Sequence, residues 1–458
     1  MFERGSHHKK NLVFVRSLAG GYISASFVIS FFSALVAYLG YLDYSIPLLF
    51  IAWIIVPLLW MGDKLTFDGK RIRRTGLMPY LLARATGTRD RLKISDIEQV
   101  ETVAFPGIKR GRNIYFTYRT TVRGKNVRFS FSSRHRGFGK IIKRLLPRID
   151  EDCLDNPSID LRDYFADKRD AGQRAKESDI PSSDVLDSSF RDIHLNPSAL
   201  RSLSDDGNDL DKANHLRRLA NELRISGLLL QALEAFRRAA ILGPRDAKLL
   251  FEFAECIRSV AGSESDQKLE RRARAMMRLA ERYAGDDNGL LSRIGESYFQ
   301  IGEWRRAGIV FKRVANAVGK NFRTLRGQAE LALREGKIAH VIHNFSAAEQ
   351  VAATNSLRRW TQTEVDYFSH LNDDEEYMEL EISRVNLLDT LDRTKRSSFR
   401  VNILGFVAIA FGLALGDDLV ANIGWAVSGV SLAIWTVTIV LTRMLSPRIP
   451  FELMETED

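Results

Sequence analysis

The stretch 290-LLSRIGESYFQIGEWRRAGIVF-311 decides the fold of the central part of this chain. Its first half places large residues and one small residue at helical spacing, at Leu291, Ile294, Gly295 and Tyr298. Its second half repeats the arrangement after a glycine turn, at Gly302, Trp304, Ala307 and Phe311. Apolar residues that recur every three or four positions predict amphipathic helices. The small residues mark where two helices touch, so the stretch predicts an antiparallel helix pair.

Similar units lie on both sides of this stretch. The first unit contains Leu216, Leu219, Ala220 and Leu223, followed by Ala232, Phe236, Ala239 and Pro244. The second contains Leu250, Phe253, Ala254 and Ile257, then Ala273, Met277 and Ala280 behind the polar insert 262-GSESDQK-268. The fourth contains Leu325, Ala329, Ala332, Gly336, Ile338, Val341 and Phe345, and residues 357–371 and 374–391 form a degenerate fifth pair. A period of 34 residues with this pattern resembles the tetratricopeptide repeat.

The resemblance implies a stacked array whose first helices line a concave surface. Proteins of this family bind an extended peptide or a partner helix there, without catalysis. The register places the following residues on that surface: Asn214, Arg217, Asn221, Arg224, Lys248, Glu255, Arg258, Glu296, Gln300, Arg323, Arg326, Glu330 and Arg334. The set has an excess of arginine, so we expect an acidic or C-terminal peptide as the ligand.

Some family members clamp a terminal carboxylate, and part of that clamp is present. Arg217 and Asn221 resemble its first half, and Arg293 stands where a later clamp residue is expected. Glu252 occupies a position where the clamp needs asparagine. We therefore do not carry the clamp specificity over to this chain.

Two pairs of apolar stretches lie at the ends of the chain. The uncharged stretches are 17–42, 44–62, 401–416 and 419–442. About 20 apolar residues suffice to cross a bilayer as a helix. A cleavable signal peptide is the alternative for the first stretch, and a buried soluble helix for the third. The pairing of each stretch with a neighbour favours two transmembrane hairpins, and small residues such as Ser26, Ser30, Gly424 and Ser428 predict packing faces.

The orientation of both hairpins follows from the flanking charges. Basic residues flank the spans at Lys9, Lys10, Arg16, Lys64, Lys395, Arg396, Arg400, Arg443 and Arg448, whereas the turns carry Asp43, Asp417 and Asp418. Basic residues stay on the cytoplasmic side. We expect an integral protein of the bacterial plasma (inner) membrane, with both termini and the soluble domains cytoplasmic.

A small basic domain follows the first hairpin. Residues 63–148 contain 22 Lys and Arg against 6 Asp and Glu, while the whole chain has a net charge of +10. The hairpin 64-KLTFDGKRIRRTG-76, a strand in 94–105, the hairpin 119-RTTVRGKNVRFSF-131 and a closing helix in 137–149 resemble bacterial pleckstrin-homology-like domains. The resemblance implies a half-open barrel capped by one helix, generally without enzymatic activity. The insert 76–88 is longer than the connection expected at that place.

The basic side chains of this domain suggest a contact with anionic lipid. The candidates are Lys70, Arg71, Arg73, Arg74, Lys140, Lys143 and Arg144. A lysine or arginine near an anionic bilayer contributes about 1 kcal/mol. An alternative is a solvated surface that only satisfies the charge rule for membrane proteins. Nucleic acid is a weaker alternative, because no recognised nucleic-acid motif is present.

The predicted fold is thus a mainly α membrane protein with five parts. They are a transmembrane hairpin (1–62), the basic domain (63–149), a polar linker with possible short helices (150–211), the repeats (212–392) and a second hairpin with a short tail (393–458). Cys153 and Cys256 are too few for a disulfide framework or a thiolate metal site. His340 and His343 lie three residues apart without a neighbouring carboxylate or cysteine.

No phosphate loop, nucleophile elbow or zinc motif occurs in the sequence, so we expect neither an enzyme nor a cofactor. The favoured function is a membrane-anchored, cytoplasm-facing scaffold that binds protein partners. The alternative is a component of a transport or envelope-biogenesis complex in which the transmembrane helices act directly.

Overall fold

A computed structural model of the full chain describes residues 13–86, 89–110, 113–124, 127–135, 137–166, 171–182, 185–186, 207–264, 266–319 and 321–445. The chain forms two compact units. The first comprises the residues up to Val15, Leu65–Arg73 and Arg91–Val365. The second comprises Arg16–Lys64, Arg74–Asp90 and the residues from Asp366 onward. The β strands and most of the repeats thus share one unit, and the long apolar helices lie in the other.

The described residues form two β sheets. One has the order β1 (Val13–Arg16), β2 (Lys64–Phe67), β3 (Arg71–Thr75) and β4 (Arg91–Lys93), and the other β5 (Gln99–Arg110), β6 (Asn113–Gly124) and β7 (Val127–Ser132). The helix α5 (Phe138–Leu145) follows. In the predicted first hairpin, the Asp68 carboxylate accepts hydrogen bonds from the amides of Lys70 and Arg71 at 2.8 and 2.7 Å, which stabilises the turn.

The first strand corrects the expected boundary of the N-terminal hairpin. The hairpin part is expected to cover residues 1–62, with its first span from residue 17, yet Val13–Arg16 within this part joins the sheet beside β2. Val13 and Val15 are buried and Phe14 between them is exposed, which is the alternation of a strand with one covered face. A second difference concerns the strand expected from residue 94, because Ile94–Asp96 forms a 3₁₀ turn and the strand begins at Gln99.

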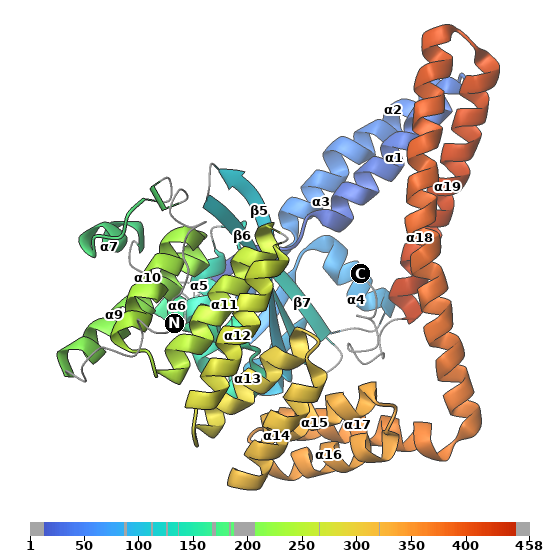
Figure 1. The fold of residues 1–458 in the computed structure, drawn as a ribbon. Helices are drawn as coiled ribbons and strands as arrows, with labels where there is room; N and C mark the ends of the chain where they lie inside the picture. Colours follow the sequence, from blue (N-terminus) through green and yellow to red (C-terminus); the bar gives the residue numbers. More distant parts are fainter. Residues whose placement is uncertain are drawn as a thin grey trace, which may run out of the picture. The chain divides into compact units, whose positions relative to one another are not determined.

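The repeats are five consecutive helix pairs, and the first four lie side by side in Figure 1. They are α9 (Gly207–Ser226) with α10 (Leu229–Leu242), α11 (Ala247–Glu264) with α12 (Gln267–Tyr283), α13 (Asn288–Gln300) with α14 (Trp304–Val318), and α15 (Phe322–Arg334) with α16 (Ile338–Val351). The fifth pair is α17 (Asn355–Asp373) with the start of α18 (Glu375–Leu415). The expectation of tetratricopeptide-like helical repeats is confirmed at this level.

Glycine turns and small contact residues recur at equivalent positions of successive helix pairs, which gives the 34-residue period. Gly302 and Gly336 close the first helices of two successive pairs with φ of +80° and +70°, a backbone region that other residues rarely adopt. The Phe311 ring packs between Gly295 and Gly327, and a Cβ on Gly295 would lie 2.6 Å from that ring. The insert at 262–268 lengthens α11 to Glu264, and α12 then begins at Gln267 with the Asp266 side chain as its N-cap.

The described residues of the segment expected to be a polar linker include the 3₁₀ turn Glu151–Cys153, α6 (Asn156–Ala166) and α7 (Ala171–Glu177), and α9 already begins at Gly207. Ile159 and Leu161 of α6 belong to a hydrophobic core that contains Val100 and Val122 of the sheet as well as Phe322 and Leu325 of α15. Leu154 pairs with Val100 of β5 in a parallel bridge. The β part, α6 and the repeats are therefore joined by one core.

Among the described residues, four helices are long and apolar enough to cross a membrane by length and composition, namely Gly20–Tyr38, Leu42–Gly62, Glu375–Leu415 and Asp418–Thr442. They correspond to α1 (Gly20–Tyr38), α2 (Leu42–Phe50), a π-helical turn (Ile51–Ile55), α3 (Val56–Gly62), α18 and α19 (Asp418–Leu445). The expected boundary at residue 393 does not interrupt α18, which runs without a break from Glu375 to Leu415. Figure 1 shows α18 and α19 side by side.

Small and polar residues bring α18 and α19 together. A Cβ on Gly424 would lie 2.6 Å from the backbone nitrogen of Ile409, so the helices pack closely at this point. The Asn402 side chain donates to the Ser428 carbonyl at 3.0 Å. In the same unit, Phe31 of α1 packs on Phe406 and Trp425, with ring centroids 5.5 and 5.4 Å apart. These contacts are typical of apolar helices that pack through small residues.

Candidate partner-binding groove

The residues assigned to the groove lie on the first helices of the pairs, and α6 packs against the same side of the array. Asn214, Arg217, Asn221 and Arg224 lie on α9, Lys248, Glu255 and Arg258 on α11, Glu296 and Gln300 on α13, and Arg323, Arg326, Glu330 and Arg334 on α15. Residues 151–160 contact Arg224, Arg323 and also Arg293, the residue expected at a clamp position. We call residues 151–160 the docked segment.

Asp160 is the charged centre of this contact. Its carboxylate accepts a hydrogen bond from Arg224 at 2.6 Å and another from Arg293 at 3.3 Å. The side chains of both arginines are 12–13% exposed. Burial raises the pKa of Asp160, but the two guanidinium groups lower it by more, so that its pKa lies below the ordinary value. One carboxylate thus links two first helices of the array, α9 and α13.

Asn156 and the backbone before it make the second set of contacts. The Asn156 side-chain oxygen accepts from Arg293 Nε at 3.1 Å, and its amide donates to the Arg293 carbonyl at 3.2 Å. Arg323 donates to the carbonyl oxygens of Glu151 and Leu154 at 2.9 and 3.0 Å. Main-chain carbonyls and one amide side chain are the groups by which any peptide can be held, so this part of the surface binds a peptide segment of its own chain.

Asp155 fixes the docked segment to the sheet on its other side. Its carboxylate accepts from the amides of Thr102 and Ser158 at 2.8 and 2.9 Å. The Thr102 hydroxyl lies 2.8 Å from that of Ser158 and 3.1 Å from that of Thr120. Burial raises the pKa of Asp155 to about 7, although these hydrogen bonds favour the charged form. The segment is therefore clamped between β5 and the repeats.

The clamp-like pair on α9 is closed by Glu252. This carboxylate accepts from Arg217 at 3.2 Å and from Asn221 at 2.6 Å. The side chains of Arg217 and Glu252 are 12% and 10% exposed. Because a glutamate stands where the family clamp needs asparagine, it satisfies the two donors that would otherwise bind a ligand carboxylate.

Two further groove arginines pack on aromatic rings. The guanidinium carbon of Arg334 lies 4.5 Å from the Trp304 ring centroid, and that of Arg326 lies 5.4 Å from the Trp360 ring centroid. Arg326 also donates to Glu330 at 2.7 Å. Reversing their charge would remove packing as well as charge. Lys248 is exposed and Arg258 is half-buried beside Glu255, so these two α11 residues are better placed to test binding.

A small pocket of about 110 Å³ lies where α6, β6, α9, α11 and α13 meet. Its lining includes Phe116, Tyr118, Phe251, Glu255 and Arg258, together with the ion pairs of Asp160. The Tyr118 hydroxyl donates to the Ile225 carbonyl at 3.3 Å. Glu255 and Arg258 of α11 thus line the pocket together with Asp160 of the docked segment.

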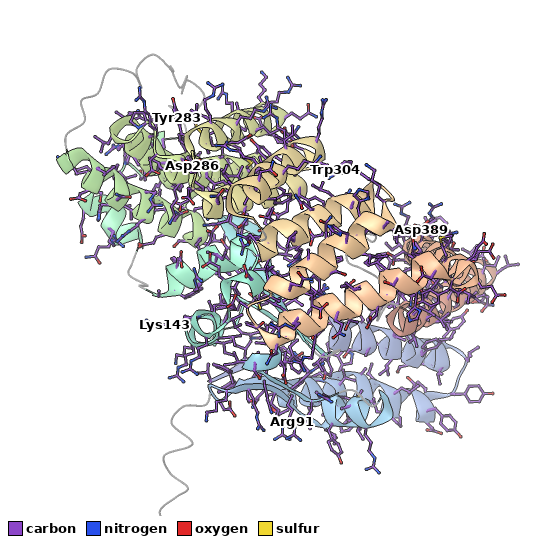
Figure 2. The ribbon with its side chains drawn as sticks, turned by 90° about the horizontal axis from the view of Figure 1, so that it is seen from below. Arg91, Lys143, Tyr283, Asp286, Trp304 and Asp389 are labelled. Carbon is purple, nitrogen blue, oxygen red and sulfur yellow. The ribbon has the colours of Figure 1, made fainter. Side chains whose placement is uncertain are left out.

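The residues suggested for lipid contact differ in their surroundings. Arg74 forms an ion pair with the buried carboxylate of Asp63 at 2.6 Å, so it has a structural role. Lys70, Arg71, Arg73, Lys140, Lys143 and Arg144 are exposed, and Lys143 is labelled in Figure 2. Arg148, one turn beyond Arg144, donates to the Gly69 carbonyl and so connects the end of the closing helix to the β2–β3 turn.

Sequence reasoning named Arg293 only at a clamp position and missed Asn156 and Asp160, which contact it. A signal was present in 156-NPSIDLRDYFA-166, where four apolar residues, Ile159, Leu161, Tyr164 and Phe165, occur within seven positions. Such density is more than a flexible linker needs. The positions that face the arginines, however, depend on the tertiary packing of α6, which the local pattern does not determine.

No protein-family model and no curated protein sequence matches the chain. Among solved structures, the chain is similar to one described as the crystal structure of the APC/C hetero-tetramer Cut9-Hcn1, with 15% sequence identity and a TM-score of 0.29. The similarity covers 68% of this chain and 69% of that chain. At this TM-score the similarity carries no argument, so the assignment rests on the helix pairs of the chain itself. They are tetratricopeptide-like helical repeats, and the described residues also contain a small β domain and four apolar helices.

Proposed function

We propose that this chain is a membrane-anchored scaffold that binds a protein partner on the concave side of its repeats, without catalysis of its own. Two hairpins would hold it in the bacterial plasma membrane, with the termini and soluble parts in the cytoplasm. The four long apolar helices and the basic residues that flank them support this anchoring. The Asn402 side chain of α18 donates a hydrogen bond to the Ser428 carbonyl of α19. This contact favours a packing role for these helices over direct transport.

The observation that carries the proposal is the docked segment itself. Arg224, Arg293 and Arg323 hold a peptide stretch by its carboxylate and carbonyl oxygens. The same surface continues over α11, where Lys248 is exposed and Arg258 lines the small pocket. We infer that an acidic peptide of a partner binds on α11 beside the docked segment, where the exposed Lys248 would attract its carboxylates.

We also infer that residues 13–16 and 64–149 form a pleckstrin-homology-like domain, with the first hairpin inserted between its first two strands. Sheets of four and three strands followed by α5 support this inference. The exposed basic residues on β3 and α5 would contact anionic lipid. The connection at Gly69 and Arg148 supports a single lipid-facing surface, because it links the two basic clusters within one unit.

The proposal predicts the effect of charge reversal on α11. Replacing Lys248 and Arg258 by glutamate should greatly reduce the recovery of protein partners with the detergent-solubilised full chain. Lys248 is exposed, and exposed substitutions usually change the free energy of unfolding by no more than about 0.5 kcal/mol, whereas Arg258 pairs with the buried Glu255, so the helical circular dichroism signal should persist with a moderately lower melting temperature. Quantitative mass spectrometry of the co-purified proteins is the measurement.

The matched control reverses Arg271 and Arg272, two exposed arginines on the second helix α12 of the same pair. This variant changes the net charge by the same amount and should recover partners as the natural sequence does. Equal loss from both variants would indicate a nonspecific charge effect. Unchanged recovery from the α11 variant would contradict binding at the proposed surface.

A further inference from the structure

The connection between β3 and β4 contains a short helix with an exposed apolar side. This helix, α4 (Leu77–Thr86), follows Gly76. Leu77, Tyr80 and Leu81 are 60%, 60% and 50% exposed, and Met78 is 37% exposed. Pro79 is buried. At 100° per residue, Leu77, Met78 and Leu81 lie together on the side opposite Pro79, with Tyr80 and Arg84 at one edge.

The start of α4 is fixed to the end of α3. A Cβ on Gly76 would lie 3.0 Å from the Gly62 carbonyl oxygen and 3.1 Å from the Asp63 Cα. Asp63 is fully buried and accepts from Arg74 at 3.0 and 2.6 Å. The Tyr22 hydroxyl of α1 donates to the same carboxylate at 2.9 Å. This network ties the residues just before α4 to the end of the first apolar hairpin.

The same end of the hairpin carries the residues that prefer a membrane–water boundary. The Trp60 indole nitrogen donates to the Ser17 carbonyl at 3.2 Å. The guanidinium carbon of Arg16 lies 5.5 Å from the Trp60 ring centroid. Tryptophan and tyrosine concentrate at bilayer interfaces, and arginine extends toward the headgroups. If the hairpin crosses the bilayer, α4 begins at the depth of the headgroups.

We propose that α4 is an interfacial helix that lies in the plane of the membrane surface, with Leu77, Met78 and Leu81 inserted at the boundary between headgroups and acyl chains. Tyr80 and Arg84 lie at its edge and contact the headgroups. An apolar helix side exposed to water is unfavourable, and the same side binds a bilayer in proportion to the apolar area it buries. This inference rests on the membrane anchoring proposed above. It explains why residues 76–88 are longer than a hairpin turn requires.

A fluorescent probe at Leu81→Cys tests the position of α4 in the full chain, reconstituted into vesicles of phosphatidylcholine and phosphatidylglycerol. Quenching by headgroup-proximal nitroxide lipids reports lipid contact, and quenching by iodide reports water. Cys153 and Cys256 are buried, and burial raises the pKa of each thiol to about 12, so both react slowly with the label. Met78→Cys serves as a second probe site if Leu81→Cys fails to fold.

Two reference sites separate this inference from the proposed anchoring. Leu58→Cys lies within α3, where the side chain is 66% exposed, and Asp286→Cys lies in the exposed turn between α12 and α13 (Figure 2). We expect the Leu81 probe to be quenched several-fold more by the nitroxide lipids, and several-fold less by iodide, than the Asp286 probe. If the Leu58 probe escapes lipid quenching, the anchoring itself is wrong.

Two other results would overturn the interfacial helix alone. With the Leu58 probe in lipid, iodide quenching of Leu81 equal to that of Asp286 would place α4 in water. Protection of Leu81 from both quenchers would mean that protein covers α4, either a second copy of the chain or a partner.

Discussion

The substitution Ala307→Arg is expected to unfold the third helix pair and to disrupt the repeat array. Ala307 on α14 is fully buried, in the hydrophobic core that contains Leu291, Ile294 and Tyr298 of α13. An arginine there would separate the two helices and leave a charge without a partner in an apolar core. Changes of this kind cost more than about 4 kcal/mol. Far-UV circular dichroism and thermal unfolding of the purified full chain should show reduced helicity and a lower first transition.

Ile309 provides the matched control on the same helix. Its side chain is 57% exposed, so Ile309→Arg introduces the same residue two positions away without entering the core. We expect its free energy of unfolding to change by no more than about 0.5 kcal/mol. Similar behaviour of the two variants would mean that α13 and α14 do not pack through Ala307.

The second large effect is expected from Asp160→Asn, which removes the charge between Arg224 and Arg293 and keeps the size of the side chain. Removing one member of a buried ion pair costs about 3–5 kcal/mol, because the remaining charge stays buried. The Asp160 side chain is 21% exposed, so we expect a smaller loss of about 2–4 kcal/mol. Amide hydrogen exchange of α6 should accelerate strongly, because the docked segment loses its central contact.

The control for this variant is Asp163→Asn on the same helix. Asp163 is 67% exposed and pairs with Arg162 at 3.2 Å, and surface pairs contribute about 0–1 kcal/mol. Exchange in α6 should therefore stay close to that of the natural sequence. If Asp160→Asn behaves like Asp163→Asn, the docked segment is not held by its ion pairs.

The difference in unfolding free energy between the natural chain and Asp160→Asn should depend on pH, and the sign of this dependence follows from the pKa of Asp160. The folded-state pKa of Asp160 lies below its ordinary value of about 3.9. Between these two values the unfolded chain binds the proton more readily, so stability rises with pH there. The stabilising contribution is complete above the ordinary pKa and is lost as the pH falls through the folded-state pKa. The difference between the natural chain and Asp160→Asn should be constant near neutral pH and shrink in acid.

The repeats could be predicted because their determinants are local and recur. Small residues such as Ala220, Gly295 and Ala329 mark helix contacts, and glycines such as Gly302 and Gly336 mark the turns. The displaced second helix of the second pair was predicted for the same reason, since Ala273, Met277 and Ala280 keep their spacing. Each such signal lies within one helix pair, so no knowledge of the remaining chain is needed.

The docked segment could not be predicted, because its contacts join residues far apart in the sequence. Asp160 and Arg224 are 64 residues apart, and Arg323 meets the Leu154 carbonyl from 169 residues away. A polar residue such as Asn156 is typical of a linker unless a partner buries it. The groove residues were assigned from the register of the array alone, which gives no information on what covers them.

The boundaries between neighbouring elements were the other feature that could not be predicted from the sequence. Charged residues before Val401 suggested a domain boundary, yet α18 continues through them because neither proline nor glycine interrupts residues 375–404. The strand Val13–Arg16 was overlooked because the apolar stretch that follows dominates its surroundings. In α18 the composition changes where the backbone conformation does not, whereas after Val13–Arg16 the backbone changes from strand to helix while apolar residues continue.

The concave side of the repeats is the proposed binding surface for protein partners. A photoactivatable amino acid at Ser259 on α11, with Ile309 on α14 as the matched site on a second helix, tests it in intact membranes. We expect partner adducts from Ser259 that disappear when Lys248 and Arg258 are replaced by glutamate, and no such adducts from Ile309. Adducts from Ile309 alone, or adducts from Ser259 that persist after the charge reversal, would contradict binding at this surface.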